Sequence, residues 1–493
     1  MSSYRDRALA ASCSAALIAG IAAIGQRLFF AADIRLTLAP LAGIVAALAA
    51  RRLADAAACA ALGVVAGAVA ASLISSPAWL PVGSWLPSVL VAAAIGAVIG
   101  ALVAFVLARS SRFEALFGLL AVVIVVGCMW TAVLQRAQTP LDSGFTLTQL
   151  VAPADLSVKL TTDESMYAVY IADVANGKPY YASVREVLDR ANRERSGELV
   201  DAHSPLSYRL PTLFVALSLL RGNGGAMVIA ALVWATLAVV SAYRLCRRFV
   251  DAPLALLGVT VLATYLVGYL GGVQLLDTEL WAGILGVSFV AAFVAAERSH
   301  GATRAAFVVA SVAAALLAAL IRELAFAFLL VGLAASLAGT SPGRLRRVLP
   351  WVPAAIAALG VYALHWRAAS IAIRSATSAA LAEPASWLRP FGVPLASAAW
   401  FAATFMRVAP FVPVALIALG LIGSVRAGRG VGERVVLALT AVGGAVACLF
   451  VGPSGPAILG TFSPPYWATI VMPAILACVP LAFVSARRDS DSS

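Results

Sequence analysis

Long apolar stretches separated by short polar breaks constrain this chain more than any other feature. A helix needs about 20 apolar residues to cross the ~30 Å hydrocarbon core of a membrane, and stretches near that length recur throughout the sequence. Hydrophobic residues make up 62% of the 493 residues and charged residues only 12%, far outside the composition of soluble domains. The chain is therefore predicted to be an all-α polytopic membrane protein.

The apolar stretches predict about fourteen transmembrane helices. They lie at 8–25, 36–50, 54–75, 88–108, 115–135, 226–243, 253–271, 279–296, 303–320, 323–339, 348–366, 394–423, 435–452 and 466–486. The first stretch lacks a clear small-residue cleavage site, so we expect it to be retained as a helix.

Arginine-rich breaks predict the orientation. If the N-terminus is cytoplasmic, the breaks at 51–52, 109–112, 244–248, 344–347, 426–434 and 486–488 all face the cytoplasm. The positive-inside rule requires this arrangement, and only the break at 26–35 departs from it. We therefore expect a plasma or inner membrane protein with both termini cytoplasmic and residues 136–225 external. Because these arginines account for the net charge of +12, no nucleic-acid partner is expected.

The cysteines and histidines do not form a recognisable site in the sequence. Six cysteines lie singly within or beside apolar stretches, with no CxxC pair and no cluster of histidines. The sequence therefore supports neither a disulfide framework nor a zinc site.

Polar residues are concentrated in the predicted external segment. Residues 136–205 contain ten of the 23 acidic residues and both lysines of the chain. Thr161 and Glu164 form a capping box that predicts a helix ending near Gly177. Asp163 and Tyr167 share one face of this helix, which continues as an apolar stripe. An alternative is that Asp163 and Glu164 only favour the helix dipole and that the tyrosines anchor the segment at the membrane interface.

Two further elements are expected in this segment. Ser183 and Glu186 form a second capping box, which predicts an amphipathic helix over 183–195 lying on the membrane surface. The apolar stretch at 210–220 is too short to span a membrane and is predicted to be a re-entrant or juxtamembrane helix. His203 would lie near the same membrane face as Asp163, either as a surface histidine or as part of a site.

The sequence "DESMYAVYIADVANGKPYY", followed by "HSPLSYRLPTLF" and by a span ending in "RLCRRF", resembles membrane glycosyltransferases of the GT-C fold. The resemblance is to the protein O-mannosyltransferase and lipid A aminoarabinose transferase group. That group has an Asp-Glu pair, a tyrosine, a glycine and a Pro-Pro-Leu segment, and Asp163, Glu164, Tyr167 and Gly177 match its pattern. The "HSPL" segment carries only one of the two prolines.

Later features are similar to the same family. Asp277 and Glu279 lie at the outer end of a span pair, and Arg322 occupies a place resembling the family's Lys-Gly turn, although the glycine is absent. The segment "SPPYWATIVMPAIL" resembles the start of the family's last helix. The resemblance divides the chain into extra N-terminal helices (1–112), the first core helix (113–135), an external catalytic loop (136–225), the remaining core (226–487) and a cytoplasmic tail (488–493).

The resemblance implies an enzyme that moves a sugar from a polyprenyl-phosphate donor to a glycan, lipid or protein acceptor of the cell envelope. Asp163 would be the base that takes the acceptor proton, with Glu164 in a supporting or capping role. Arg322 and Arg407 would bind the lipid phosphate, although Arg322 could instead pair with Glu323 or Glu279, and Arg407 could extend to lipid headgroups. The remaining substrate-binding candidates are Tyr167, His203, Tyr208, Arg209, Asp277 and Glu279.

Some GT-C enzymes use a divalent cation, Mg²⁺ or Mn²⁺, and others do not. The carboxylates of Asp163, Glu164, Asp277 and Glu279 could offer oxygen ligands, but no spacing in this chain requires a metal. Two other functions remain open: a lipid or polysaccharide exporter without catalysis, and a polysaccharide polymerase or ligase that would use arginines of a later loop, at 367–393.

Overall fold

The structure is a computed structural model, and every regular element in its described part is helical. It describes residues 34–50, 52–75, 82–110, 112–139, 146–151, 163–194, 208–220, 223–338, 344–374, 411–428, 430–446 and 469–484. Within this part, seven helices are long and apolar enough to cross a membrane. They are Val89–Arg109, Phe113–Gln138, Gly224–Cys246, Ala252–Leu270, Thr278–Glu297, Gly301–Ile321 and Trp351–Arg374. The chain is thus a helical, membrane-embedded protein, as predicted, and the count of about fourteen spans stays a prediction.

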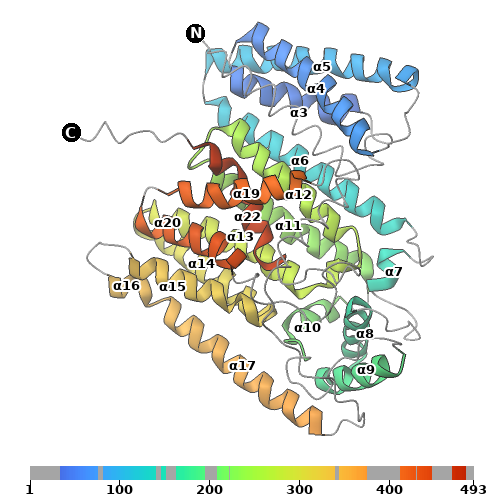
Figure 1. Ribbon diagram of the computed structural model, residues 1–493, viewed down its shortest axis with the longest axis vertical. Coiled ribbons are helices and arrows are strands. Elements are labelled where there is room, and N and C mark those ends of the chain that lie inside the picture. Colours follow the sequence, from blue (N-terminus) through green and yellow to red (C-terminus); the bar gives the residue numbers. More distant parts are fainter. Residues whose placement is uncertain are drawn as a thin grey trace.

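Three N-terminal helices pack on one another at one edge of the molecule (Figure 1). They are α3 (Ile34–Ala50), α4 (Leu53–Ser75) and α5 (Val82–Arg109). They meet through small residues: a Cβ on Gly43 would lie 2.8 Å from the backbone of Gly100. Because lipid tails are as apolar as leucine, close contact of small residues is what holds such helices together. α3 also contacts α6 (Phe113–Gln138) and α12 (Ala252–Leu270).

The centre of the molecule is built around two largely buried helices, α12 and α13 (Thr278–Glu297). They contact α11 (Gly224–Cys246), α14 (Gly301–Ile321), α15 (Phe326–Ala338), α20 (Val431–Ala438) and α22 (Met472–Ala477). α19 (Phe411–Arg426) packs in turn against α20 and α22. α20 continues into a π-helical turn, Leu439–Gly443, and α22 is followed by a 3₁₀ turn, η6 (Val479–Phe483). The predicted span at 466–486 is therefore broken within its described residues. α17 (Trp351–Arg374) lies at the periphery (Figure 1).

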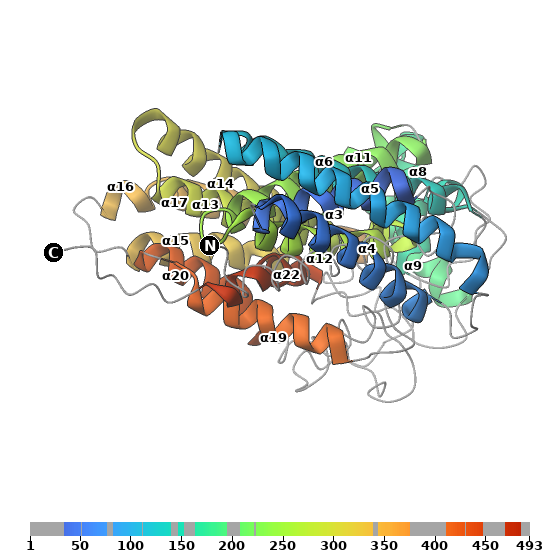
Figure 2. The same ribbon diagram turned by 90° about the horizontal axis from the view of Figure 1, so that it is seen from above.

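The described parts of the breaks at 109–112, 244–248, 344–347 and 426–434 lie toward one end of the bundle, where α16 (Arg344–Val348) and the start of α20 lie (Figure 2). Arg247 pairs with Glu114 at 3.2 Å, and Arg347 pairs with Glu297 at 3.3 Å. Arg298 binds the buried Glu433 and donates a 2.8 Å hydrogen bond to the carbonyl of Arg248. These contacts join breaks that the charge pattern assigned to the same side of the membrane.

The short helices of the predicted external loop lie at the opposite end (Figures 1 and 2). They are α7 (Leu147–Val151), α8 (Asp163–Ala175), α9 (Tyr180–Glu194) and α10 (Thr212–Ser218). Two details differ from the sequence-based predictions. α9 begins at Tyr180, so Ser183 is not its N-cap, because the buried Ser183 hydroxyl binds Asp173 instead. α8 is buried on every side from Met166 to Asp173, rather than on one stripe, because α7, α9 and α10 all pack against it.

Candidate functional site

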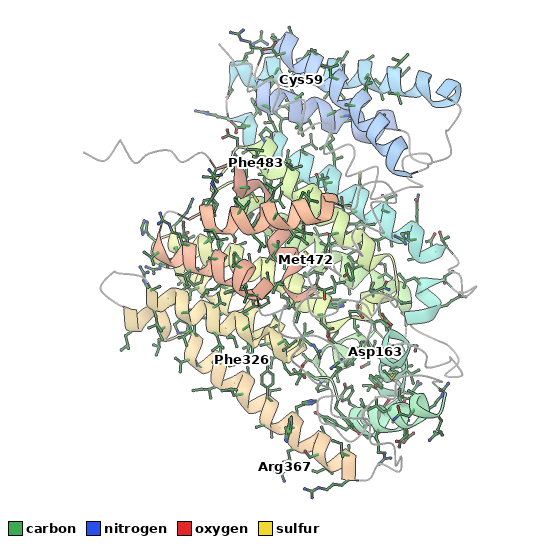
Figure 3. The ribbon with its side chains drawn as sticks, viewed as in Figure 1. Cys59, Asp163, Phe326, Arg367, Met472 and Phe483 are labelled. Atoms are coloured by element: carbon green, nitrogen blue, oxygen red, sulfur yellow. The ribbon has the colours of Figure 1, made fainter. Side chains whose placement is uncertain are left out.

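The Asp-Glu pair lies in the first turn of α8, where this helix meets the bundle (Figure 3). Glu164 is buried, with 4% of its surface exposed, and Asp163 is half-buried. Thr161, the predicted N-cap, lies outside the described residues. Because neighbouring helical residues point about 100° apart, the two carboxylates face different neighbours. Asp163 therefore lies half-buried in the first turn of a helix, within the segment that the sequence predicts to be external.

The far end of α8 is fixed by a helix-terminating turn and a buried carboxylate. Gly177 has a φ of 85°, and Lys178 N–H donates to the Asp173 carbonyl at 3.0 Å, as in a Schellman motif. The Asp173 side chain accepts hydrogen bonds from Ser183 Oγ at 2.6 Å and from Lys178 Nζ at 3.0 Å. These bonds link the end of α8 to α9.

A second pair of acids lies at the beginning of α13. Asp277 and Glu279 are 1% and 2% exposed, and the short 3₁₀ helix before them, η2 (Val273–Leu276), contacts α8. Thr278 Oγ1 donates a 2.9 Å hydrogen bond to Glu279 Oε2. The tight turn from α12 through η2 therefore brings a second Asp/Glu pair to the first turn of α8.

A buried arginine binds one of these acids. Arg322, at the end of α14, is 2% exposed, and its Nη2 lies 2.9 Å from Glu279 Oε1. Its Nη1 lies 3.4 Å from Glu323 Oε2. The internal pairing that the sequence left open is therefore present, and it places Arg322 at the bundle end that carries Asp277 and Glu279.

Arg209 supplies a second cation to the same region. Its Nε donates a 3.2 Å hydrogen bond to the Tyr167 hydroxyl, and its carbonyl accepts one from Tyr180 at 2.8 Å. Burial raises the pKa of Tyr167, so its hydroxyl stays protonated. The sequence assigned Arg209 to the substrate and not to the phosphate, and the structure shows that the charges of Asp163 and Glu279 act on it.

The charges of these residues act on one another. The pKa of Asp277 is raised well above its usual range, first by burial and then by the negative charges of Glu164, Glu279 and Asp163, whereas Arg209 opposes the shift. Asp163, Arg209, Glu279 and Arg322 also influence Tyr167. Four acids, two arginines and a tyrosine that are far apart in sequence thus form one site.

Tyr208, another predicted site residue, is not part of this group. The Tyr208 side chain is buried near Asp189 of α9, and burial raises its pKa to about 12. His203 and Arg407 lie outside the described residues.

One residue of this region was not predicted. His365, in the apolar run of α17, bonds through Nδ1 to the Tyr181 hydroxyl at 2.8 Å and through Nε2 to the Tyr208 carbonyl at 2.9 Å. It attaches the peripheral α17 to the segment that precedes Arg209. A histidine within an apolar stretch was the available sequence signal.

Among the described residues, no group of three or more histidines, cysteines, aspartates or glutamates is arranged to hold a metal ion. The sequence left a divalent cation open, and this finding assigns no ligand to it.

The fold and site together define a helical membrane protein with a buried, charged site at one end of its bundle. Comparison of the chain with protein-family models, with curated proteins and with solved structures finds no match. Any assignment of an activity must therefore come from the site itself.

Proposed function

We propose that this chain is an integral membrane glycosyltransferase that moves a sugar from a polyprenyl-phosphate donor to a cell-envelope acceptor. The observation that carries the proposal is that Asp163 of α8 lies in one site with Arg209 and the acids of α13. Sugar transfer from a lipid phosphate needs a base for the acceptor proton and a cation for the departing phosphate. In this proposal Asp163 supplies the base and Arg209 the cation, and the charge of Asp163 acts on Arg209.

In the proposed reaction, the acceptor oxygen forms a bond to the anomeric carbon while the bond between that carbon and the phosphate oxygen breaks. The acceptor proton passes to the Asp163 carboxylate, and the bonding electrons leave with the lipid phosphate. Arg209 stabilises the charge that develops on this phosphate. Arg322 is already paired with Glu279, so in this proposal it adds positive charge to the site without contacting the phosphate directly.

Replacement of Asp163 tests the function. Loss of a general base lowers a rate by about 10²- to 10⁴-fold, whereas loss of a first-turn acid from a helix costs about 0.3–1 kcal/mol of stability. We expect Asp163→Asn to lower the rate of transfer from a radiolabelled polyprenyl-phosphate sugar pool by about 10²- to 10⁴-fold, without a large change in thermal stability. Asp251→Asn is the matched control, because Asp251 is an exposed residue that precedes α12. Transfer by Asp163→Asn above about a third of wild type, far from the 10²-fold expectation, would exclude Asp163 as the base.

We also propose that both termini are cytoplasmic and that the site faces outward. The joining of the arginine-rich breaks at the opposite end of the bundle supports this orientation. Reporter fusions at Gly197 and Ser493 test it, with an external signal expected only at Gly197.

A further inference from the structure

Asp277 is buried without a hydrogen-bond partner in the described part of the chain. Both of its carboxyl oxygens are buried and unpaired there, although the residue is only 1% exposed. It occupies the N-cap position of α13, where an aspartate usually accepts a backbone N–H, yet its side chain makes no such bond. Buried polar groups are almost always hydrogen-bonded, so this carboxyl group needs an explanation.

The charges that face Asp277 come from several elements. α8 contributes Glu164 and Asp163, α13 contributes Glu279, and the segment before α10 contributes Arg209. Tyr265 and Tyr269 of α12 also lie near enough for the Asp277 charge to influence them. Of the cations, Arg322 is bound to Glu279 and Arg209 to Tyr167.

An ionised Asp277 would add a further negative charge to a group of three carboxylates, of which Glu164 and Glu279 are buried and Asp163 is half-buried. Burial and repulsion both favour the neutral acid, and the raised pKa of Asp277 agrees with this. A neutral carboxylic acid has one O–H donor, and such an acid can serve as a donor in a buried site.

We propose that Asp277 is a neutral carboxylic acid whose O–H group donates a hydrogen bond to an oxygen atom of the bound substrate. The oxygen that carries the proton then has its partner in the ligand, which explains why the described part of the chain provides none. The acceptor is a phosphate or a hydroxyl oxygen, and the identity of the substrate as a polyprenyl-phosphate sugar rests on the proposed function. The protonation of Asp277 does not rest on it.

Infrared spectroscopy of the full chain in nanodiscs at pH 7 tests the protonation. A neutral carboxylic acid has a carbonyl stretching band that an ionised carboxylate lacks. We expect a band that is absent from Asp277→Asn and unchanged in Asp251→Asn. Absence of any Asp277-dependent band would overturn the proposal.

Ligand addition tests the hydrogen bond and separates the two acceptors. A shift of the band on adding undecaprenyl phosphate alone identifies a phosphate oxygen. A shift only with undecaprenyl phosphate carrying a hexose identifies a sugar oxygen. A band that neither ligand shifts would also overturn the proposal.

Two variants separate a donor role from simple packing. The amide of Asp277→Asn keeps a hydrogen-bond donor, whereas Asp277→Leu has none. We therefore expect the leucine variant to bind the ligand that shifts the wild-type band about threefold to tenfold more weakly than the asparagine variant does. Equal binding by two folded variants would contradict the donor role. Absence of sugar transfer by the wild-type chain would instead count against the proposed function. The carbonyl band of Asp277 in the absence of ligand would still be expected.

Discussion

Arg322 and Glu279 form a buried ion pair in which Nη2 lies 2.9 Å from Oε1 and the two side chains are 3% and 2% exposed. The pair connects the end of α14 to the first turn of α13. Because both charges are removed from water, each depends on the other for compensation. The pair therefore fixes the position of the α13 acids relative to α14.

Removal of one member of this pair should be strongly destabilising. Arg322→Met leaves Glu279 as an uncompensated buried charge, which typically costs about 3–5 kcal/mol. The double variant Arg322→Met/Glu279→Leu should recover much of this loss, because both charges are then absent. Chemical unfolding in detergent measures the difference. Glu323→Gln is the control: its side chain is 34% exposed and 3.4 Å from Arg322, so a loss as large as that of Arg322→Met would contradict this account.

The stability of the chain should depend on pH through Asp277. Its pKa is raised, so the folded chain keeps a proton that the unfolded chain releases above a pKa of about 3.9. The stabilisation is complete below that pH and is lost as the pH rises through the folded-state pKa. Asp277→Asn should therefore gain stability relative to wild type as the pH increases toward neutrality. Thermal unfolding over a pH series checks this, and a pH-independent difference between Asp277→Asn and wild type would argue against it.

The bond between α8 and α9 should contribute measurably to stability. Ser183→Ala removes a buried 2.6 Å hydrogen bond to the Asp173 carboxylate, and bonds to charged groups contribute about 1.5–3 kcal/mol. Glu186→Gln is the control, because Glu186 is 54% exposed where it pairs with Lys178, and surface changes usually stay within about ±0.5 kcal/mol. The unfolding free energy of Ser183→Ala should therefore fall further than that of Glu186→Gln. Similar values for the two variants would show that the buried bond contributes no more than the surface pair.

Close helix packing predicts opposite effects for two glycines. A Cβ on Gly423 of α19 would lie 2.1 Å from the Cys478 carbonyl oxygen, whereas a Cβ on Gly360 of α17 would meet nothing within 4 Å. Gly423→Ala should therefore separate α19 from the η6 segment and cost about 1–3 kcal/mol. Gly360→Ala should be neutral or stabilising by up to about 1 kcal/mol, because alanine favours helix. Unfolding measurements on both variants provide the test, which fails if Gly423→Ala is as stable as Gly360→Ala.

The class of protein could be predicted from the sequence because apolar length and arginine placement are local properties that the bilayer imposes directly. Helix positions such as 36–50 and 279–296 agree with α3 and α13 within two residues at each end. The end of α8 was also predictable, since Gly177 has the positive φ that a glycine allows.

Tertiary structure decided which polar residues meet. The sequence identified Asp163, Asp277, Arg209 and Arg322 singly, but their separations along the chain contain no information about distance. It also misplaced the start of α9, because a capping box predicts an N-terminus from local hydrogen bonds alone. The Ser183 hydroxyl instead donates a hydrogen bond to the buried Asp173 carboxylate.

Apolar periodicity and charge placement thus determined that this chain is a bundle of membrane helices. Only the packing of α8, η2, α13 and α14 brought its acids and arginines into one buried site, because side-chain contacts across helices depend on depth, rotation and register that no single helix specifies.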